Sequence, residues 1–278
     1  MPLPAARRKE RSAIGAEHSV TSVAPAALLE IDGLRLSFGG VTALDGVSFA
    51  VRPGLITGLI GPNGAGKTTL FNAVSGMIRP HAGRVRFDGH DITGLPPERI
   101  TKAGLIRSFQ IARGLPTLTV IENLMLYGAE QPGEALWQAL TRTPAMRRRE
   151  ALLREQAWQM LQRLELQPVA DNLASDLSGG QKKLIELGRV LMRRPRMILL
   201  DEPAAGVNPS LARLLGGHIR SCRDDGISFL VVEHNMALIG DICDEVVVMA
   251  EGRCLMQGSF AEVRNDHRVQ TAYMGRAA

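Results

Sequence analysis

Eight residues, from Gly61 to Thr68, carry the clearest chemical signal in the chain, because glycines recur among them and Lys67 and Thr68 close the run. Glycine lets the backbone curl until successive N–H groups point at one anion. Lys67 adds a full charge for the β- and γ-phosphates, which makes it a catalytic candidate, and the Thr68 hydroxyl suits Mg²⁺. This phosphate loop (residues 61–68) predicts a nucleotide site. The predicted ATP-binding residues there are Gly61, Pro62, Asn63, Gly64, Ala65, Gly66, Lys67, Thr68 and Thr69.

Two carboxylates and a histidine follow apolar segments elsewhere in the chain. Asp201 and Glu202 come directly after residues 198–200. A phosphate-bound Mg²⁺ commonly takes an acid from a neighbouring strand, which predicts Asp201 as a metal ligand and Glu202 as the residue that orients or deprotonates the attacking water. His234 comes just after residues 229–232. Because ligands bind at the carboxyl ends of parallel strands, we expect it beside Glu202 and the γ-phosphate.

Short apolar segments predict the strands that must bring these groups together. The predicted strands cover residues 34–38, 47–51, 55–60, 85–87, 197–200, 229–232, 245–249 and 254–257. A helix is expected directly after the phosphate loop, and a second one around residues 211–219. That second helix separates two strands of the fully buried type, which indicates a parallel sheet.

The middle of the chain, from about residue 119 to 191, has helical rather than strand periodicity. Thr119 and Glu122 have the spacing of a capping box at a helix start. Apolar residues between 153 and 164 recur on one helix face, and Pro168 is predicted to end that helix.

The composition is that of an ordinary globular chain, with 278 residues of which 45% are hydrophobic and 22% charged. No segment approaches the roughly 18 consecutive apolar residues of a membrane-spanning helix. The net charge of +5 is compatible with nucleic acid or an anionic membrane surface and does not distinguish them. Residues 147–149 are a run of arginines that could meet acidic lipid headgroups or simply face solvent.

The first 27 residues and the cysteines bear on where the chain works. Residues 1–27 are basic at their start but lack the apolar stretch of a secretory signal, so we expect a disordered tail. Three scattered cysteines without CxxC spacing fit a reducing compartment and argue against a structural zinc site.

A second glycine-containing segment identifies the family. Leu177, Ser178, Gly179, Gly180 and Gln181 form the signature segment, in which the serine can cap the following helix while the glycines expose backbone N–H groups. Together with the phosphate loop and the acid pair, this segment resembles ABC transporter ATPases. The resemblance covers roughly residues 28–275.

The resemblance implies an α/β fold: a RecA-like phosphate-loop NTPase core with a mainly parallel sheet, an N-terminal antiparallel β subdomain and an inserted α-helical subdomain. It places the ATPase domain at residues 28–278, with the helical subdomain at about 111–190 and a C-terminal extension at about 259–278. The implied cofactors are ATP and Mg²⁺.

The resemblance also implies individual roles. Phe38 matches an aromatic that stacks on adenine, and Gln110 matches a glutamine that contacts Mg²⁺ and the nucleophilic water. ATP would lie between the phosphate loop of one subunit and the signature segment of another, so Ser178 and Gly180 would contact the γ-phosphate held by a partner. Asn208 stands where many relatives have Asp in the loop that communicates across the dimer, so it keeps the capacity to hydrogen-bond there but lacks the charge.

Several segments are similar to the ATPases of branched-chain amino-acid importers. They are Phe109-Gln110, residues 119–124, residues 202–208 and Tyr273-Met274-Gly275. The implied function is ATP hydrolysis that drives amino-acid uptake, at the cytoplasmic face of the inner (plasma) membrane. The implied partners are two transmembrane permease subunits, a second ABC ATPase in a homo- or heterodimer, and, indirectly, an extracytoplasmic solute-binding protein; no nucleic acid is expected.

Two alternatives remain open at this point. His234-Asn235 is similar to the ATPase of lipopolysaccharide export, and importers of urea or amides share much of the same pattern. A soluble ABC ATPase that acts on nucleic acid is compatible with the basic pI, but the chain has one cassette and no long heptad insertion.

Overall fold

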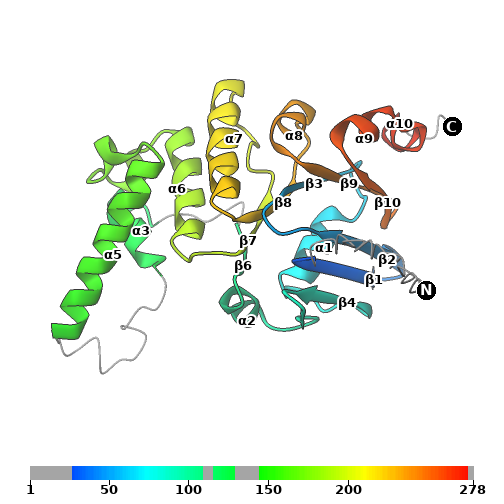
Figure 1. Cartoon of the computed structure of the whole chain (residues 1–278), viewed down its shortest axis with the longest axis horizontal. Helices are drawn as coiled ribbons and strands as arrows, with labels where there is room; N and C mark the ends of the chain where they lie inside the picture. The colour runs from blue at the N-terminus through cyan, green and yellow to red at the C-terminus, as the bar shows by residue number, and fades with distance from the viewer. Residues whose placement is uncertain (1–26, 109–114, 129–143, 275–278) are drawn as a thin grey trace, which may run out of the picture.

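The computed structural model describes residues 27–108, 115–128 and 144–274, and they form two sheets with helices around them (Figure 1). The first sheet is antiparallel, in the order β2-β1-β4-β5. Its strands are β1 (Leu29–Phe38), β2 (Val41–Val51), β4 (Ala82–Phe87) and β5 (His90–Asp91). The turn between β4 and β5 is made by Asp88 and Gly89, whose φ angles are 51° and 76°. An Asp-Gly pair is typical of such hairpin turns, because both positions require a positive φ.

The second sheet has the order β10-β9-β3-β8-β7-β6 and is parallel except at β10. Its strands are β3 (Ile56–Ile60), β6 (Leu105–Arg107), β7 (Met197–Asp201), β8 (Ser228–Val232), β9 (Glu245–Ala250) and β10 (Arg253–Gly258). The expected fold class, a mainly parallel sheet accompanied by an antiparallel β unit, is therefore confirmed.

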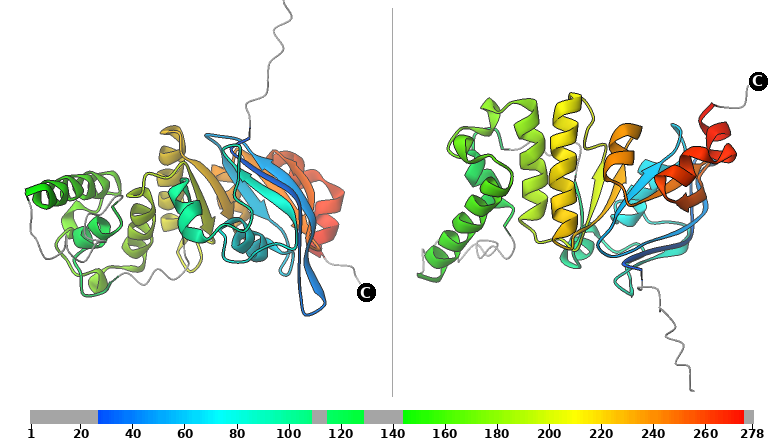
Figure 2. Two further views of the ribbon diagram at one scale, coloured as in Figure 1. Left: turned by 90° about the horizontal axis from the view of Figure 1, so that it is seen from below. Right: turned by 45° about the horizontal axis from the view of Figure 1, so that its top comes forward.

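Helices cover the second sheet and extend beyond it. They are α1 (Lys67–Val74), α2 (Pro97–Lys102), α3 (Val120–Leu126), α5 (Pro144–Arg163), α6 (Gly179–Leu191), α7 (Pro209–Asp224), α8 (Met236–Ile242), α9 (Phe260–Asn265) and α10 (His267–Met274). Figures 1 and 2 show α3, α5 and α6 at one end of the molecule and α9 and α10 at the other. None of the helices in the described ranges combines the length and apolar character that crossing a bilayer requires.

Both faces of the central strands are buried, in separate apolar clusters. In β8, Phe229 and Val231 join the cluster beneath α6, α7 and α8, whereas Leu230 and Val232 join the cluster between the two sheets. The second cluster also contains Phe71 of α1, which has no exposed surface. A strand buried on both sides reads as a continuous apolar run, which is why the sequence pattern identified β7 and β8.

Of two predictions about helix ends in the helical part of the chain, one is confirmed and one is wrong. The capping box is confirmed, since the Thr119 side chain accepts from the Glu122 N–H and the Glu122 carboxylate accepts from the Thr119 N–H. The prediction that Pro168 ends the long helix is wrong, because α5 already ends at Arg163. Glu165 adopts a φ of 57°, and the Leu166 N–H reaches back 2.8 Å to the Leu161 carbonyl. That closing bond terminates the helix before the proline.

Candidate nucleotide site

The phosphate loop connects β3 to α1, and two of its glycines cannot be replaced without a steric clash. Gly61 has a φ of 153°, and a Cβ there would lie 2.1 Å from the carbonyl oxygen of Met249. Gly66 has a φ of 97°, and a Cβ there would lie 2.4 Å from the carbonyl oxygen of Ala43. A Cβ on Gly64, by contrast, would meet nothing within 4 Å. The loop is therefore held tightly against β9 and β2 on one side and is open on the other.

Lys67 is the first residue of α1 and lies within this loop. Its side chain is 7% exposed, and Nζ donates to the carbonyl oxygens of Gly61, at 2.7 Å, and Pro62, at 3.0 Å. Burial lowers the pKa of Lys67, while the negative charges of Glu202 and Asp201 act in the opposite direction. The acid pair therefore lies close enough to the phosphate loop to act electrostatically on Lys67.

The order of strands explains why these groups meet. β8 lies between β3 and β7, so the phosphate loop, the acid pair at the end of β7 and His234 after β8 all emerge at the carboxyl edge of one sheet. The Glu202 N–H donates to the Val232 carbonyl at 2.9 Å, and Glu202 has a φ of 47°. Its Oε1 lies 2.8 Å from His234 Nε2. The expected neighbourhood of Glu202 and His234 is thus present, on a strained backbone of the kind found at functional sites.

Asp201 forms an ion pair with Arg107, a residue to which the sequence analysis assigned no role. Arg107 Nη2 lies 2.7 Å from Asp201 Oδ2, and the two side chains are only 10% and 11% exposed. The same guanidinium donates from Nη1 to Asn72 Oδ1 at 2.6 Å and lies 5.6 Å above the ring of Phe71. Arg107 therefore ties β6 and α1 to the end of β7. The only signal in the sequence is an arginine after two apolar residues, which does not reveal its partner.

Glu233 is a second residue to which the sequence analysis assigned no role. It is 4% exposed, and its Oε1 accepts from the Ala204 N–H at 2.7 Å. Its Oε2 accepts from the N–H groups of His234, at 3.0 Å, and Asn235, at 3.3 Å. A carboxylate that ends an apolar strand and precedes a histidine is the signal that could have found it.

The residues available to Mg²⁺ are few and of the right kind. No group of three or more metal-binding side chains occurs in the part of the chain that the structure describes. Thr68, exposed at the start of α1, offers a hydroxyl, and Asp201 offers a carboxylate. One or two hard oxygen ligands beside a phosphate cradle suit Mg²⁺, which keeps several waters and takes further ligands from substrate phosphates. The donor set fits the implied cofactor.

The signature segment starts α6 at a different surface. Ser178 Oγ accepts from the Gln181 N–H at 3.3 Å, and Gln181 Oε1 accepts from the Ser178 N–H at 2.9 Å, which confirms that Ser178 caps this helix. Ser178, Gly180 and Asn208 line one surface pocket, and no residue of the phosphate loop lines it. Asn208 itself caps α7, because its Oδ1 accepts from the Leu211 N–H at 2.9 Å.

Of the two remaining expected site residues, Phe38 is described by the structure and Gln110 is not. Phe38 ends β1 and is 48% exposed, so it is not a core strand residue and is free to meet a planar ligand. Gln110 lies outside the described residues, as do Phe109 and Gly275.

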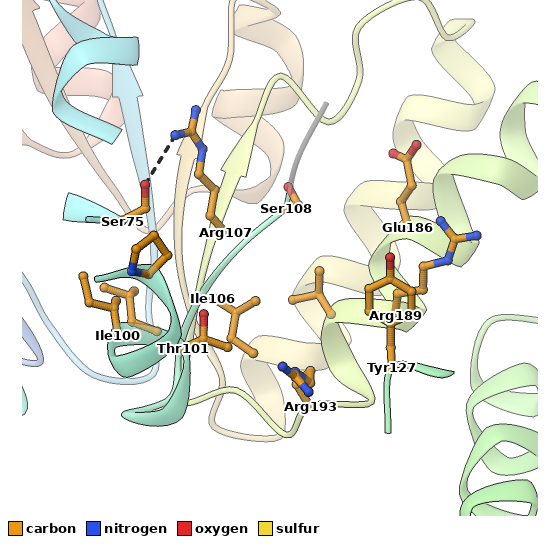
Figure 3. Close-up of a pocket in the computed structure, with 13 residues that line it drawn as sticks. Ser75, Ile100, Thr101, Ile106, Arg107, Ser108, Tyr127, Glu186, Arg189 and Arg193 are labelled. Carbon is orange, nitrogen blue, oxygen red and sulfur yellow. Dashed lines mark hydrogen bonds between the residues drawn. The ribbon is translucent and has the colours of Figure 1, made fainter. Parts of the chain in front are cut away.

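A groove separates β6 and α2 from α6, and it contains Arg107 (Figure 3). Its volume is about 210 Å³. One wall is mostly apolar, with Ile100 and Ile106, and the opposite wall carries Arg189 of α6 and Arg193, which follows that helix. Ser108, two residues before Gln110, also lines it.

Comparison with known proteins gives a consistent result. Residues 44–205 match the family model described as ABC transporter. The high-affinity branched-chain amino acid transport ATP-binding protein BraF of Pseudomonas aeruginosa is 38% identical over 251 residues, which is 90% of this chain and 98% of BraF. The probable branched-chain amino acid transport ATP-binding protein LivG of Methanocaldococcus jannaschii is 38% identical, over 89% of this chain and 97% of that protein. A crystal structure of an ATP-binding cassette of an ABC transporter, in its ADP conformation, matches with a TM-score of 0.78 and 37% identity, over 90% of this chain and all of that one.

Proposed function

The chain belongs to the ATP-binding proteins of ABC transporters, and from that premise we propose that it drives the uptake of branched-chain amino acids. It is an ATPase whose hydrolysis of ATP is coupled to transport. The observation that carries the choice of substrate is its similarity, along nearly the whole of both chains, to BraF and LivG, which are named as branched-chain amino acid transport proteins.

The proposed catalytic roles follow from the geometry at the sheet edge. Glu202 accepts a proton from the attacking water, and His234 Nε2, 2.8 Å from Glu202 Oε1, orients that carboxylate and reaches toward the γ-phosphate. Lys67 and the loop amides hold the phosphates, with Thr68, Asp201 and Gln110 as the residues that would hold Mg²⁺. The metal, when bound, neutralises charge on the β- and γ-phosphates. Phe38 stacks on the adenine.

We propose that two such cassettes form the working unit. The signature segment opens into a pocket without phosphate-loop residues, so the γ-phosphate that Ser178 and Gly180 would bind belongs to a second cassette. Ser178 can serve both purposes, because a hydroxyl that accepts from Gln181 N–H keeps its own proton to donate. ATP then stabilises the closed dimer, since each ligand gains contacts only there.

The groove beside Arg107 is the proposed contact for the permease (Figure 3). An apolar wall opposite the exposed side chain of Arg193 suits an amphipathic helix with an acidic side chain. We propose that this contact holds the chain at the cytoplasmic face of the membrane as a peripheral subunit. We also propose the domain limits expected above: a tail at 1–27, an ATPase domain at 28–278, a helical subdomain at about 111–190 and a C-terminal extension at about 259–278.

Reconstitution tests the substrate. The cassette, its permeases and the solute-binding protein are placed in proteoliposomes, and ATP hydrolysis is measured with the binding protein loaded with leucine or with urea. In a parallel assay, the cassette and permeases are given lipopolysaccharide. We expect stimulation by leucine only, and none when Glu202 is changed to Gln. Stimulation by urea or lipopolysaccharide alone would instead support one of the alternative transporters.

A further inference from the structure

Glu233 lies between the two loops that carry the proposed catalytic pair. Its position is set by β8, which places it one residue past Val232 and leaves its carboxylate 4% exposed. No ion pair of Glu233 exists among the described residues, so backbone N–H groups take the place of a cationic partner. Buried charges are retained in proteins only where such compensation exists.

The N–H donors come from both loops. The Ala204 N–H, which binds Oε1 at 2.7 Å, belongs to the loop that follows Glu202. The His234 N–H, which binds Oε2 at 3.0 Å, belongs to the loop that follows β8. One carboxylate therefore connects, through its two oxygens, the backbone segments from which Glu202 and His234 extend.

From this bridge we infer that Glu233 is a positioning residue for hydrolysis: it fixes the separation of Glu202 and His234 by holding both of their loops to one buried carboxylate. The backbone hydrogen bond from the Glu202 N–H to the Val232 carbonyl holds the two loops together only at the point where they leave the sheet. Beyond it, the loop turns at Glu202 and continues through Ala204 to Asn208, which lines the pocket proposed to meet the second cassette. The bridge thus also joins the hydrolytic pair to the segment that faces that cassette.

The chemistry of the bridge predicts the effect of an amide. Glutamine has one acceptor oxygen and an NH₂ group that only donates, so Glu233→Gln can satisfy one loop but directs a donor at the N–H of the other. Aspartate is one methylene shorter and is expected to reach only one loop. The phosphate loop is not part of the bridge, so nucleotide binding should be preserved while the chemical step slows.

The test is a kinetic cycle on the full chain with its permeases, and the inference rests on the roles proposed for Glu202 and His234. We expect Glu233→Gln to lower kcat by about 10- to 100-fold, because a displacement of about 1 Å at a reacting group can cost about 100-fold. The Kd for ATP should stay within about twofold, since binding and chemistry are separable in such variants. Glu245→Gln is the matched control, because Glu245 starts β9, pairs with Arg52 at 2.8 Å and takes no part in the proposed site.

The cycle separates positioning from a general structural effect. In a His234→Ala background, Glu233→Gln should reduce kcat by less than about threefold more, because the pair it positions is already lost. An equal further reduction in both backgrounds, or a wild-type kcat for Glu233→Gln, would overturn the inference. If Glu202→Gln hydrolysed ATP at the wild-type rate, the proposed roles would fail instead, and the two failures are thereby distinguished.

A measurement on the unaltered protein covers the case in which the variant does not fold. Backbone amide exchange by NMR reports whether the Ala204 and His234 N–H groups are hydrogen-bonded. We expect both to exchange slowly. Exchange of either at the rate of a free amide would show that the bridge does not exist and would also overturn the inference.

Discussion

Replacing Arg107 by methionine removes the cation that neutralises Asp201 and leaves a carboxylate that is 11% exposed. Breaking a buried ion pair from one side costs about 3–5 kcal/mol of unfolding free energy, because the remaining charge keeps its desolvation penalty. The bond to Asn72 and the contact with the Phe71 ring are lost as well. A chain of this length loses about 2–4 °C of Tm per kcal/mol, so we expect Arg107→Met to lower the Tm by about 6–20 °C.

The measurement is urea and thermal denaturation of the full chain without nucleotide or Mg²⁺. Arg220→Met is the matched control, because Arg220 pairs with Asp241 at the same distance of 2.7 Å while the two side chains are 37% and 48% exposed. An exposed pair contributes at most about 1 kcal/mol. Adding Asp201→Asn to Arg107→Met should recover part of the loss, because neither charge of this pair then remains. A loss for Arg107→Met no larger than that for Arg220→Met would refute the reasoning.

Three further predictions follow from individual contacts. Lys67→Ala removes the buried charge of the phosphate loop and should weaken ATP binding by at least about tenfold in a titration, whereas unchanged affinity would contradict the nucleotide site. Asn208→Ala deletes the cap on the Leu211 N–H and should cost about 1 kcal/mol in urea denaturation, whereas Asn208→Asp keeps an acceptor and should cost nothing. Burial raises the pKa of Cys222 to about 11 and of Cys243 to about 12. Fewer than about one thiol in a thousand is then a thiolate at pH 8, so both should resist alkylation until urea unfolds the chain, and rapid labelling of the folded chain would disprove this.

Local and nearly local patterns were predictable from the sequence. The phosphate loop, the capping boxes and the apolar run of β7 each depend on residues within a few positions of one another. The meeting of Glu202 with His234 was also predictable, because parallel strands bring their carboxyl ends to the same edge.

The contacts that escaped prediction join segments far apart in the chain. Arg107 meets Asp201 only because β6, a strand of three residues without an alternating pattern, pairs beside β7. Glu233 meets Ala204 because β8 pairs in parallel with β7, which brings the loops that follow these two strands together. The end of α5 at Arg163 escaped for another reason, since a bond from the Leu166 N–H back along the chain can stop a helix without any proline or glycine.

Arg107 has a guanidinium at the acid end of β7 and a side chain that lines the groove between α2 and α6. A planar, rigid group shared in this way cannot move for one neighbour without moving for the other. If a protein bound in the groove favours one position of Arg107, it changes the free energy with which a divalent cation binds near Asp201. Thermodynamic linkage then requires the cation to change that protein's affinity by the same factor. Through this one side chain, metal binding and the binding of a neighbouring protein would be coupled equilibria.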